Sequence, residues 1–427
     1  MHEAMQEMRE QQAGASPAAI ACPFCGLGCD DLSPSRSTTE LSVDSHGCLV
    51  AETGFVRALS APRIKPRVDG QDASLEDALA RTAQFLREAS LPLFAGLCGD
   101  LADMRGALRL AECTGGAIDH RNGDALMTNL SVLEESGWIV TSLGEARNRA
   151  DLLVLVGDGL LTRFPRLAER VMRQDERLHT ESAVELVRVG SDPAASGAAS
   201  INIPVPIDQI RDFIGVLRGR LANRPIDSAR FPQAAKLAGL LDRAKYPVIA
   251  FAASAFGAEP HADLIVRALA ALVRDLNGRS RAALLPLGGA DGETSAHQVS
   301  SWHTGFSIRQ SFHTGVPEYR PRSGATRQLL DSGGVDLLVW ISTLNDAPPT
   351  SASVPTLILG HPAMKLEREP EVFIPLAVPG VHRAGAIHRG DGLALLPLAA
   401  VADSALPESA DIFARLLELV VEEQRTC

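Results

Sequence analysis

Four cysteines near the start of the chain carry its strongest chemical signal. Cys22, Cys25 and Cys29 lie within CPFCGLGC, and Cys48 completes the spacing C-x2-C-x3-C-x18-C. Closely spaced thiolates can wrap several faces of one metal centre, and a distant fourth thiolate closes the set. Glycines between the cysteines permit the tight turns that such a loop requires. Four thiolates suit a [4Fe–4S] cluster or a tetrahedral zinc ion.

The order of the spacings favours the iron–sulfur cluster. A zinc ribbon more often has two C-x2-C knuckles, and this chain has one. Zinc and an empty site remain alternatives, and His46 is a minor alternative ligand. In a cytosolic protein such a group of cysteines indicates metal binding rather than disulfides. We therefore predict that the metal ligands are Cys22, Cys25, Cys29 and Cys48.

The elements that would position these residues are those of an α/β protein. Short, wholly apolar runs alternate with helical patterns, which predicts parallel sheets buried on both faces. Strands are expected at 92–98, 151–159, 183–190, 247–254, 282–289, 336–343 and 355–360. Helices are expected at 74–89, 101–114, 165–178, 207–221, 233–244, 262–277, 324–332 and 408–425.

The changes of pattern along the chain predict four parts. Residues 1–19 form a flexible N-terminal extension, and residues 20–62 a Cys-rich metal or cluster domain. Residues 63–245 form a first α/β domain with interleaved segments, and 246–427 a second one with a C-terminal helix.

Charge and hydropathy argue against two classes of partner. The formal net charge is −11, whereas a protein that binds nucleic acid needs clustered Lys and Arg to contact phosphates. The sequence has no apolar run of the roughly 18–20 residues that a membrane span requires. The N-terminal residues lack the apolar core of a signal peptide, so we predict a cytoplasmic location without a membrane partner.

The cysteine spacing resembles the cluster signature of molybdopterin oxidoreductases, and CPFCGLGCDD resembles that of formylmethanofuran dehydrogenase B subunits. Further stretches resemble this family in the same order along the chain: 143–159, 297–306, 315–321 and 380–396. The resemblance implies a molybdopterin-oxidoreductase-like fold, in which a small Cys-rich domain precedes two Rossmann-like parallel α/β domains. It also implies that a separate subunit supplies the family's remaining domain, so the chain should occur in a hetero-oligomer.

The chain departs from the family at the metallopterin site. Redox-active members carry a Cys-His pair shortly after an Ile-Asp strand end, and here Ala125 and Leu126 follow Ile118-Asp119 at those positions. Neither side chain can bind a metal, although Asp124 is an alternative oxygen ligand. The next predicted strand is followed here by Gly157-Asp158-Gly159, whereas the corresponding loop of the family resembles Gly-Cys-Asn-Pro. The resemblance therefore implies that a tungsto- or molybdopterin has been lost.

A later stretch, 297–320, concentrates histidine and aromatic residues. They form either the floor of a vestigial pocket or part of a surface loop and helix. These residues are His297, Trp302, His303, Arg309, His313 and Tyr319.

Two hypotheses follow from the resemblance. The first is a non-redox B subunit of a formyltransferase/hydrolase complex in methanopterin-linked one-carbon metabolism, which converts formaldehyde to formate. This chain would have no catalytic residue; it would hold the hydrolytic A subunit, together with C- and D-type subunits and a furan-type one-carbon carrier as candidate partners. The second is the redox-active B subunit of a formylmethanofuran dehydrogenase with a tungsto- or molybdopterin, and the retained cysteines favour it.

Overall fold

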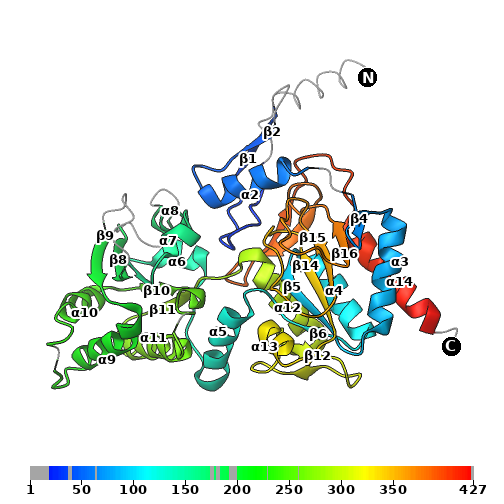
Figure 1. Ribbon diagram of the computed structural model, residues 1–427. Helices are drawn as coiled ribbons and strands as arrows, with labels where there is room; N and C mark the ends of the chain where they lie inside the picture. The colour runs from blue at the N-terminus through cyan, green and yellow to red at the C-terminus, as the bar shows by residue number, and fades with distance from the viewer. Residues whose placement is uncertain are drawn as a thin grey trace, which may run out of the picture.

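The computed structural model describes residues 19–36, 41–62, 65–173, 177–178, 183–191, 200–227, 229–257 and 259–424. The predicted N-terminal extension lies outside these residues except for Ala19, and so does Cys427. Two α/β units lie side by side, and the N-terminal segment lies above the junction between them (Figure 1).

The smaller unit is built on a five-stranded parallel sheet in the order β11-β10-β7-β8-β9. Its strands are β7 (Leu152–Val156), β8 (Glu185–Gly190), β9 (Ser200–Pro204), β10 (Pro247–Phe251) and β11 (Ala283–Pro286). Alternate residues of β7 point to opposite faces, because side chains along a strand alternate. Leu152 and Val154 pack against α9 (Ile210–Leu221), α10 (Ala234–Arg243) and α11 (Ala262–Leu276). Leu153 and Leu155 face α6 (Leu143–Arg149), α7 (Leu160–Arg163) and α8 (Leu167–Met172).

The larger unit contains a nine-stranded mixed sheet in the order β13-β12-β6-β5-β14-β15-β16-β3-β4. Its central strands, from β6 to β16, are parallel, and the outer strands are antiparallel. The parallel strands are β5 (Pro92–Cys98), β6 (Ala117–Ile118), β14 (Leu337–Ser342), β15 (Thr356–Gly360) and β16 (Val372–Pro375). The outer strands are β3 (Arg67–Val68), β4 (Gln71–Asp72), β12 (Gln310–Ser311) and β13 (Glu318–Tyr319).

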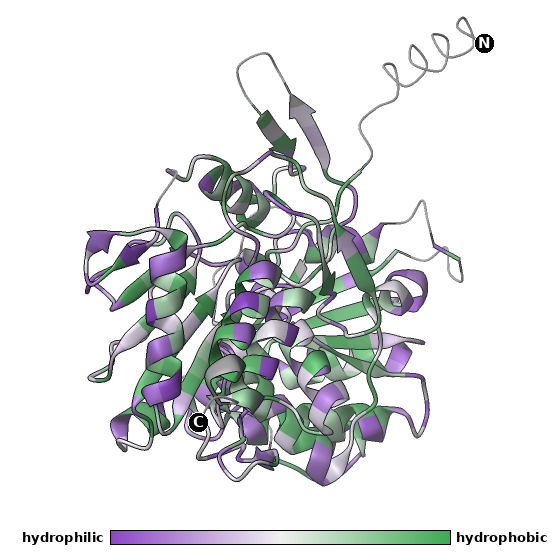
Figure 2. Cartoon of the chain, turned by 90° about the vertical axis from the view of Figure 1, so that its right-hand side faces the viewer, coloured by the Kyte–Doolittle hydropathy of each residue, from purple (hydrophilic) through white to green (hydrophobic). Residues whose placement is uncertain are grey.

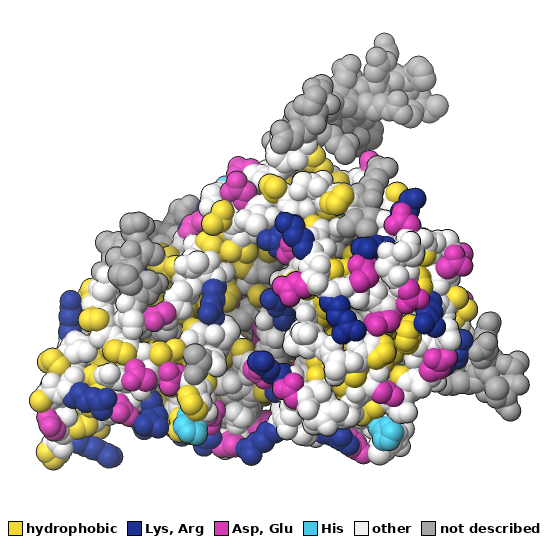
Figure 3. All heavy atoms as spheres, viewed as in Figure 1, with side chains coloured by type: hydrophobic (Ala, Val, Ile, Leu, Met, Phe, Trp, Pro, Cys, Tyr) yellow, Lys and Arg dark blue, Asp and Glu magenta, His cyan; other side chains and the backbone are white. Residues whose placement is uncertain are grey.

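Helices cover this sheet unequally. One face packs against α3 (Leu75–Glu88), α4 (Leu101–Cys113), α5 (Gly123–Ser136), α12 (Glu293–Thr304) and α14 (Ser409–Gln424). The other face packs against α13 (Thr326–Asp331) and the loops that follow β14 and β15. Figure 2 shows hydrophobic strands enclosed by helices whose outer faces are hydrophilic. On the face shown in Figure 3, basic and acidic side chains are interspersed over both units.

The Cys-rich segment contains β1 (Ser33–Arg36), β2 (Leu41–Asp44) and α2 (Leu49–Leu59). Its four cysteines share one apolar core with Leu153 and Leu155 of β7 and with two short strands, β17 (Gly385–His388) and β18 (Leu395–Leu398). The segment is therefore stabilised mainly by the α/β units on which it packs.

The α/β class and the parallel sheets are as predicted, but the sheets do not follow the predicted boundary at 245–246. Strands β10 and β11, expected in the second domain, pair with β7 in the sheet of the first. Strands β14 to β16 instead join β5, which lies far earlier in the chain. The larger unit is thus made of two separated stretches of sequence, and the smaller unit is inserted between them.

Candidate functional site

The cysteine loop is closed by its own backbone. The Ile20 and Leu32 backbones form an antiparallel bridge, and the Cys22 N–H donates to the Cys29 carbonyl at 2.8 Å. Gly26 and Gly28 have φ angles of +80° and +59°, a region that glycine adopts without steric cost. The C-x2-C-x3-C segment consequently folds as one compact turn.

Gly26 also brings the loop against two distant backbones. A Cβ atom at Gly26 would lie 2.1 Å from the carbonyl oxygen of Gly288, just after β11. The Gly26 carbonyl accepts a hydrogen bond from the Gly390 N–H at 2.7 Å, in the turn between β17 and β18. Three chain segments meet here without side chains between them, so the loop is clamped between both units.

The four predicted metal ligands are all buried and none forms a disulfide. Burial, and secondarily the neighbouring Cys25, raise the pKa of the Cys22 thiol well above its usual value. Burial likewise raises the pKa of Cys25 to about 12. Burial raises the pKa of Cys29 too, against the opposing charges of Arg170 and Arg166.

The donor types and the burial fit a metal or cluster, but the side chains are not arranged as ligands. Among the described residues, no three or more His, Cys, Asp or Glu side chains are arranged to hold a metal ion. His46, the minor alternative, instead places Nε2 2.8 Å from the Asp31 carbonyl oxygen. Metal binding by the cysteines therefore stays a prediction.

The two aspartates that end CPFCGLGCDD attach the loop to α8. Arg166 donates two hydrogen bonds of 2.7 Å to the Asp31 carboxylate, and Arg170 donates one of 2.8 Å to Asp30. Bidentate pairing of this kind is both strong and specific in geometry. The Arg166 hydrogen bonds hold the pKa of Asp31 below its usual value.

The strand end after β6 carries an ion pair between two buried side chains, Asp119 and Arg309. Asp119 accepts from Arg309 Nε at 3.0 Å and from the Thr326 N–H at 2.7 Å. Arg309 also donates to Asp124, the alternative oxygen ligand. Burial raises the pKa of Asp119, and Arg309 and Thr326 oppose this effect.

Ala125 and Leu126 lie in the first turn of α5, on the walls of two different cavities. Ala125 faces an open, polar cavity of about 730 Å³ that Arg309 also lines. Leu126 faces a smaller one of about 230 Å³. Nearby His120 is buried, which lowers its pKa to about 4, and its Nδ1 accepts from the Asn122 N–H at 2.9 Å. The neutral imidazole is therefore fixed by the local backbone.

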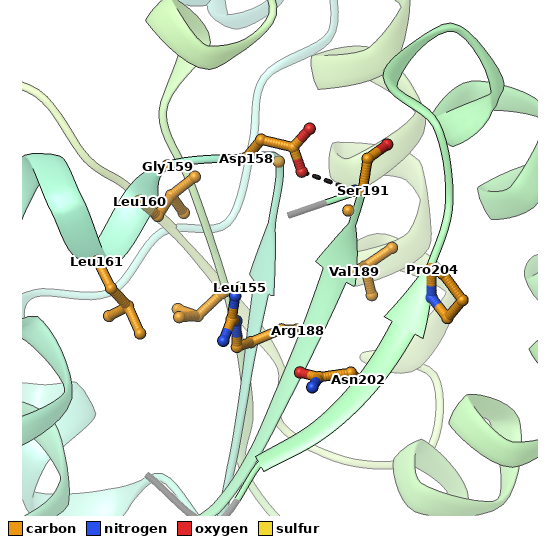
Figure 4. A pocket seen from close by; sticks show the side chains of 12 residues that line it. Leu155, Asp158, Gly159, Leu160, Leu161, Arg188, Val189, Ser191, Asn202 and Pro204 are labelled. Atoms are coloured by element: carbon orange, nitrogen blue, oxygen red, sulfur yellow. Dashed lines mark hydrogen bonds between the residues drawn. The ribbon is translucent and has the colours of Figure 1, made fainter. Parts of the chain in front are cut away.

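The Gly157-Asp158-Gly159 loop lines a third cavity, of about 300 Å³, at the carboxyl ends of β7 and β8 (Figure 4). Asp158 Oδ1 accepts a 2.7 Å hydrogen bond from the Ser191 N–H, the dashed line in Figure 4. Gly190 allows this contact, because a Cβ there would lie 2.3 Å from the same oxygen. Asp158 thus ties two strand ends together.

The aromatic and histidine residues of 297–320 do not form one site. His297 contacts Ser307 Oγ at 2.8 Å through Nδ1, and His303 contacts Glu112 at 2.9 Å. Trp302 is 64% exposed and packs edge-on against His388. Of the other two, His313 is exposed, and Tyr319 stacks on Phe306.

The stretch 380–396 makes two contacts that the sequence pattern did not reveal: its Arg383 joins the two stretches of the larger unit, and its Asp391 reaches the smaller unit. Arg383 donates to both oxygens of Asp100, at 3.0 and 3.1 Å, and to Asp103 at 2.7 Å. All three side chains are at least 95% buried. Asp391, in the same stretch, accepts from the Leu143 N–H at 3.1 Å and so reaches α6 of the smaller unit.

These features define an α/β protein of two open sheets with an N-terminal cysteine loop clamped between them. In the part of the chain that the structure describes, no helix is both long and apolar enough to cross a bilayer. No protein-family model matches the sequence.

Three comparisons show what the chain is similar to. The B subunit of tungsten-containing formylmethanofuran dehydrogenase 2 from Methanocaldococcus jannaschii is 25% identical over 407 residues, covering 88% of this chain and 91% of the relative. The B subunit of the formyltransferase/hydrolase complex Fhc from Methylorubrum extorquens is 28% identical over 379 residues, covering 84% and 99%. A chain in the crystal structure of the Methylorubrum extorquens complex FhcABCD with methylofuran has a TM-score of 0.75 at 24% identity, again covering 84% and 99%. The resemblance predicted from the sequence to these two kinds of B subunit is confirmed.

Proposed function

We propose that this chain is the non-redox B subunit of a formyltransferase/hydrolase complex in methanopterin-linked one-carbon metabolism. In this role it acts as a scaffold for the hydrolytic subunit. The B subunit of the Methylorubrum extorquens complex supports the proposal, because nearly its whole length aligns with this chain. The similar fold of a chain in the FhcABCD structure points the same way.

The observation that carries the non-redox role is the start of α5. Ala125 and Leu126 stand where the family resemblance implies a metal-ligating Cys and an assisting His, and an aliphatic side chain cannot ligate a metal. Two carboxylates that precede these residues, the buried Asp119 and the exposed Asp124, are paired with Arg309. A guanidinium cation neutralises these acids in the position where a metallopterin site would need free ligands.

The finer architecture proposed is that of a molybdopterin oxidoreductase with a Cys-rich N-terminal domain. Its support is the cysteine spacing, the parallel five-stranded sheet and the parallel centre of the nine-stranded sheet. Within that domain Cys22, Cys25, Cys29 and Cys48 would bind a [4Fe–4S] cluster, with zinc as the alternative. Because the segment shares its core with both α/β units, a metal there would act as a structural staple.

The proposed partners are A-, C- and D-type subunits and a furan-type one-carbon carrier. Their support is the composition of the similar crystal structure, FhcABCD with methylofuran. The competing function is a redox-active formylmethanofuran dehydrogenase subunit, and the retention of all four cysteines is the observation that favours it. The cytoplasmic location stays a prediction.

Coexpression with and without the A-, C- and D-type subunits tests the proposal. We expect one complex on size exclusion, formate release from a formylated carrier, and tungsten and molybdenum far below stoichiometry by elemental analysis. Stoichiometric tungsten or molybdenum, together with formate-dependent reduction of a viologen dye, would establish the redox alternative instead. A chain that stays monomeric beside its candidate partners would contradict the scaffold role.

A further inference from the structure

Exposed apolar side chains surround the cavity of about 230 Å³ that lies between α5 and α12. Twelve large hydrophobic side chains are exposed in the described part of the chain, and the contacts of seven place them here. The first three are Leu133 on α5 and Ile139 and Val140 in the segment after it, and Leu133 and Val140 line the cavity themselves. Such residues are ordinary when scattered singly, whereas a contiguous group marks an interaction site.

Three more members come from the β17–β18 hairpin and α12. Leu393 directly follows Gly392, which lines the cavity. Leu395 is the cross-strand partner of His388, and Trp302 of α12 packs edge-on against the His388 ring. Trp302 is 64% exposed and Leu393 75%, so both present most of their surface to solvent. The hairpin and α12 therefore extend the apolar surface beyond the cavity.

Phe306, the seventh member, joins this surface back to α5. It follows α12 and stacks on Tyr319, with 5.5 Å between the ring centroids. The Tyr319 hydroxyl donates to Glu134 of α5 at 3.4 Å, and Glu134 is the residue after Leu133. The seven side chains thus form one apolar patch around the mouth of the cavity.

The size of the apolar patch fits one side of a protein–protein interface. Burying an aliphatic side chain fully removes about 60–120 Å² from water, and burying an aromatic one about 150–250 Å². At exposed fractions of 39–75%, the seven members present on the order of 400 Å² of apolar surface. One side of a standard interface buries about 800 Å², of which about 450–500 Å² is apolar. The patch alone supplies most of that apolar area.

We propose that the apolar patch docks a different subunit of the complex, one with an apolar face and a basic side chain opposite Glu134. This inference rests on the scaffold function proposed above. A second copy of this chain is a poor occupant, because a two-fold interface brings the same surface of both copies together. Two exposed Glu134 carboxylates would then share one interface between chains that each carry a formal net charge of −11.

The cavity determines what the partner inserts. The part of its wall formed by Leu126, Leu130 and Trp138 is apolar. An apolar cavity of about 150 Å³ holds a benzene ring, so the present one accommodates a leucine- or phenylalanine-sized side chain of the partner. A pocket that receives an anchor side chain, enclosed by apolar contacts that exclude water, is the usual form of an interface hot spot.

The complex of the full-length chain with the A-, C- and D-type subunits tests the proposal by dilution. Mass photometry between micromolar and nanomolar concentration measures how much of this chain dissociates. Trp302→Ala removes a hot-spot aromatic and should raise the dissociation constant about thirtyfold. Leu133→Glu places a second acid beside Glu134 at the cavity mouth and should raise it at least as much. Ile226→Glu is the matched control, because Ile226 is also 39% exposed but lies in the smaller unit outside the patch, so it should change nothing.

Two measurements on the chain alone complete the test. Thermal unfolding shows whether each variant is folded, and Trp302→Ala still decides the question if Leu133→Glu is not. Light scattering should show a monomer, and a dimer that Trp302→Ala dissociates would assign the patch to a second copy and overturn the proposal. A wild-type complex from which both patch variants dissociate no more readily than Ile226→Glu would overturn it too, with the scaffold function intact. The absence of any wild-type complex would instead contradict the scaffold function itself.

Discussion

Arg383 offers the sharpest test of how the two separated stretches of the larger unit are held together. Its guanidinium lies between Asp100 and Asp103, and all three side chains are buried. Replacement by Met keeps much of the apolar stem but leaves two carboxylates without their cation. Breaking a buried pair by removing one partner costs about 3–5 kcal/mol. Thr343 and Ser409 still donate to Asp103, which places the expected loss toward the lower end of that range.

The loss should depend on pH. Burial already raises the pKa of Asp103 in the folded protein, and Arg383 is the main opposing influence. Without Arg383 the folded state should hold a proton on this aspartate to higher pH than the unfolded state does. An acid with a raised folded pKa contributes stability that is lost as pH rises, so Arg383→Met should be most harmful at neutral and alkaline pH.

Thermal or urea unfolding of wild type and Arg383→Met at pH 5.5 and pH 8 measures both effects. Arg243→Met is the matched control, because Arg243 forms an ion pair with Glu185 in which both side chains are about half exposed. Such surface pairs contribute about 0–1 kcal/mol. The double variant Arg383→Met/Asp103→Asn should recover part of the loss by removing one uncompensated charge. If Arg383→Met is no more destabilising than Arg243→Met, the reasoning on the buried network is wrong.

Three further perturbations test the buried acid Glu293, the contact of Gly26 with the Gly288 backbone, and the cysteines as metal ligands. Burial raises the pKa of Glu293 in the folded protein to about 8, so wild type should lose stability as pH rises from about 4.5 to 8. Glu293→Gln lacks this loss and should become more stable than wild type over that interval, by up to a few kcal/mol. The free energy of unfolding measured at several pH values checks this, and the same pH dependence in both proteins would contradict it. Gly26→Ala should loosen the cysteine loop, since a Cβ would lie 2.1 Å from the Gly288 carbonyl oxygen. Limited proteolysis should then cleave faster within residues 20–62. An unchanged cleavage rate would show that the close contact between Gly26 and Gly288 is not needed to hold the loop. Cys25→Ser should lower the iron or zinc content of anaerobically purified protein while Cys113→Ser, which changes an exposed cysteine, should not; equal metal content in wild type and both variants would remove the cysteines as ligands.

The sequence predicted the elements better than their assembly. The run that becomes β7 is apolar at every position, as strands buried on both faces must be, and it stood out for that reason. Its predicted end was too late, because Gly157 has a φ of 105° and turns the chain after Val156. Strand β9, SINIP, was not predicted, since it lies at the edge of its sheet and alternates polar with apolar residues. Which sheet β10 joins depends on long-range pairing, which local patterns do not contain.

The buried ion pairs could not be predicted from the sequence for a similar reason. Asp100 and Asp103 form the capping box of α4, and this local role alone explains their residue types. Their partner Arg383 lies 283 and 280 residues away. Glu293 looks like an ordinary acidic residue in the first turn of a helix, and only the folded chain shows that it is buried. The replacement of the family's Cys-His pair by Ala125 and Leu126 could be recognised from the sequence, because it depends on residue type alone.

Three strand ends show how the polar positions of this fold are used. In open α/β sheets, ligands usually bind beyond the carboxyl ends of the strands. Here the aspartates that follow β5, β6 and β7 are engaged by the protein itself: Asp100 by Arg383, Asp119 by Arg309 and Thr326, and Asp158 by the Ser191 N–H. Each bond fixes a loop that comes from a different part of the chain. Redirecting Asp100 or Asp119 toward a substrate or metal would be costly, because their buried partners Arg383 and Arg309 would be left unpaired. At these three strand ends the aspartates serve rigidity, which agrees with the scaffold role proposed above.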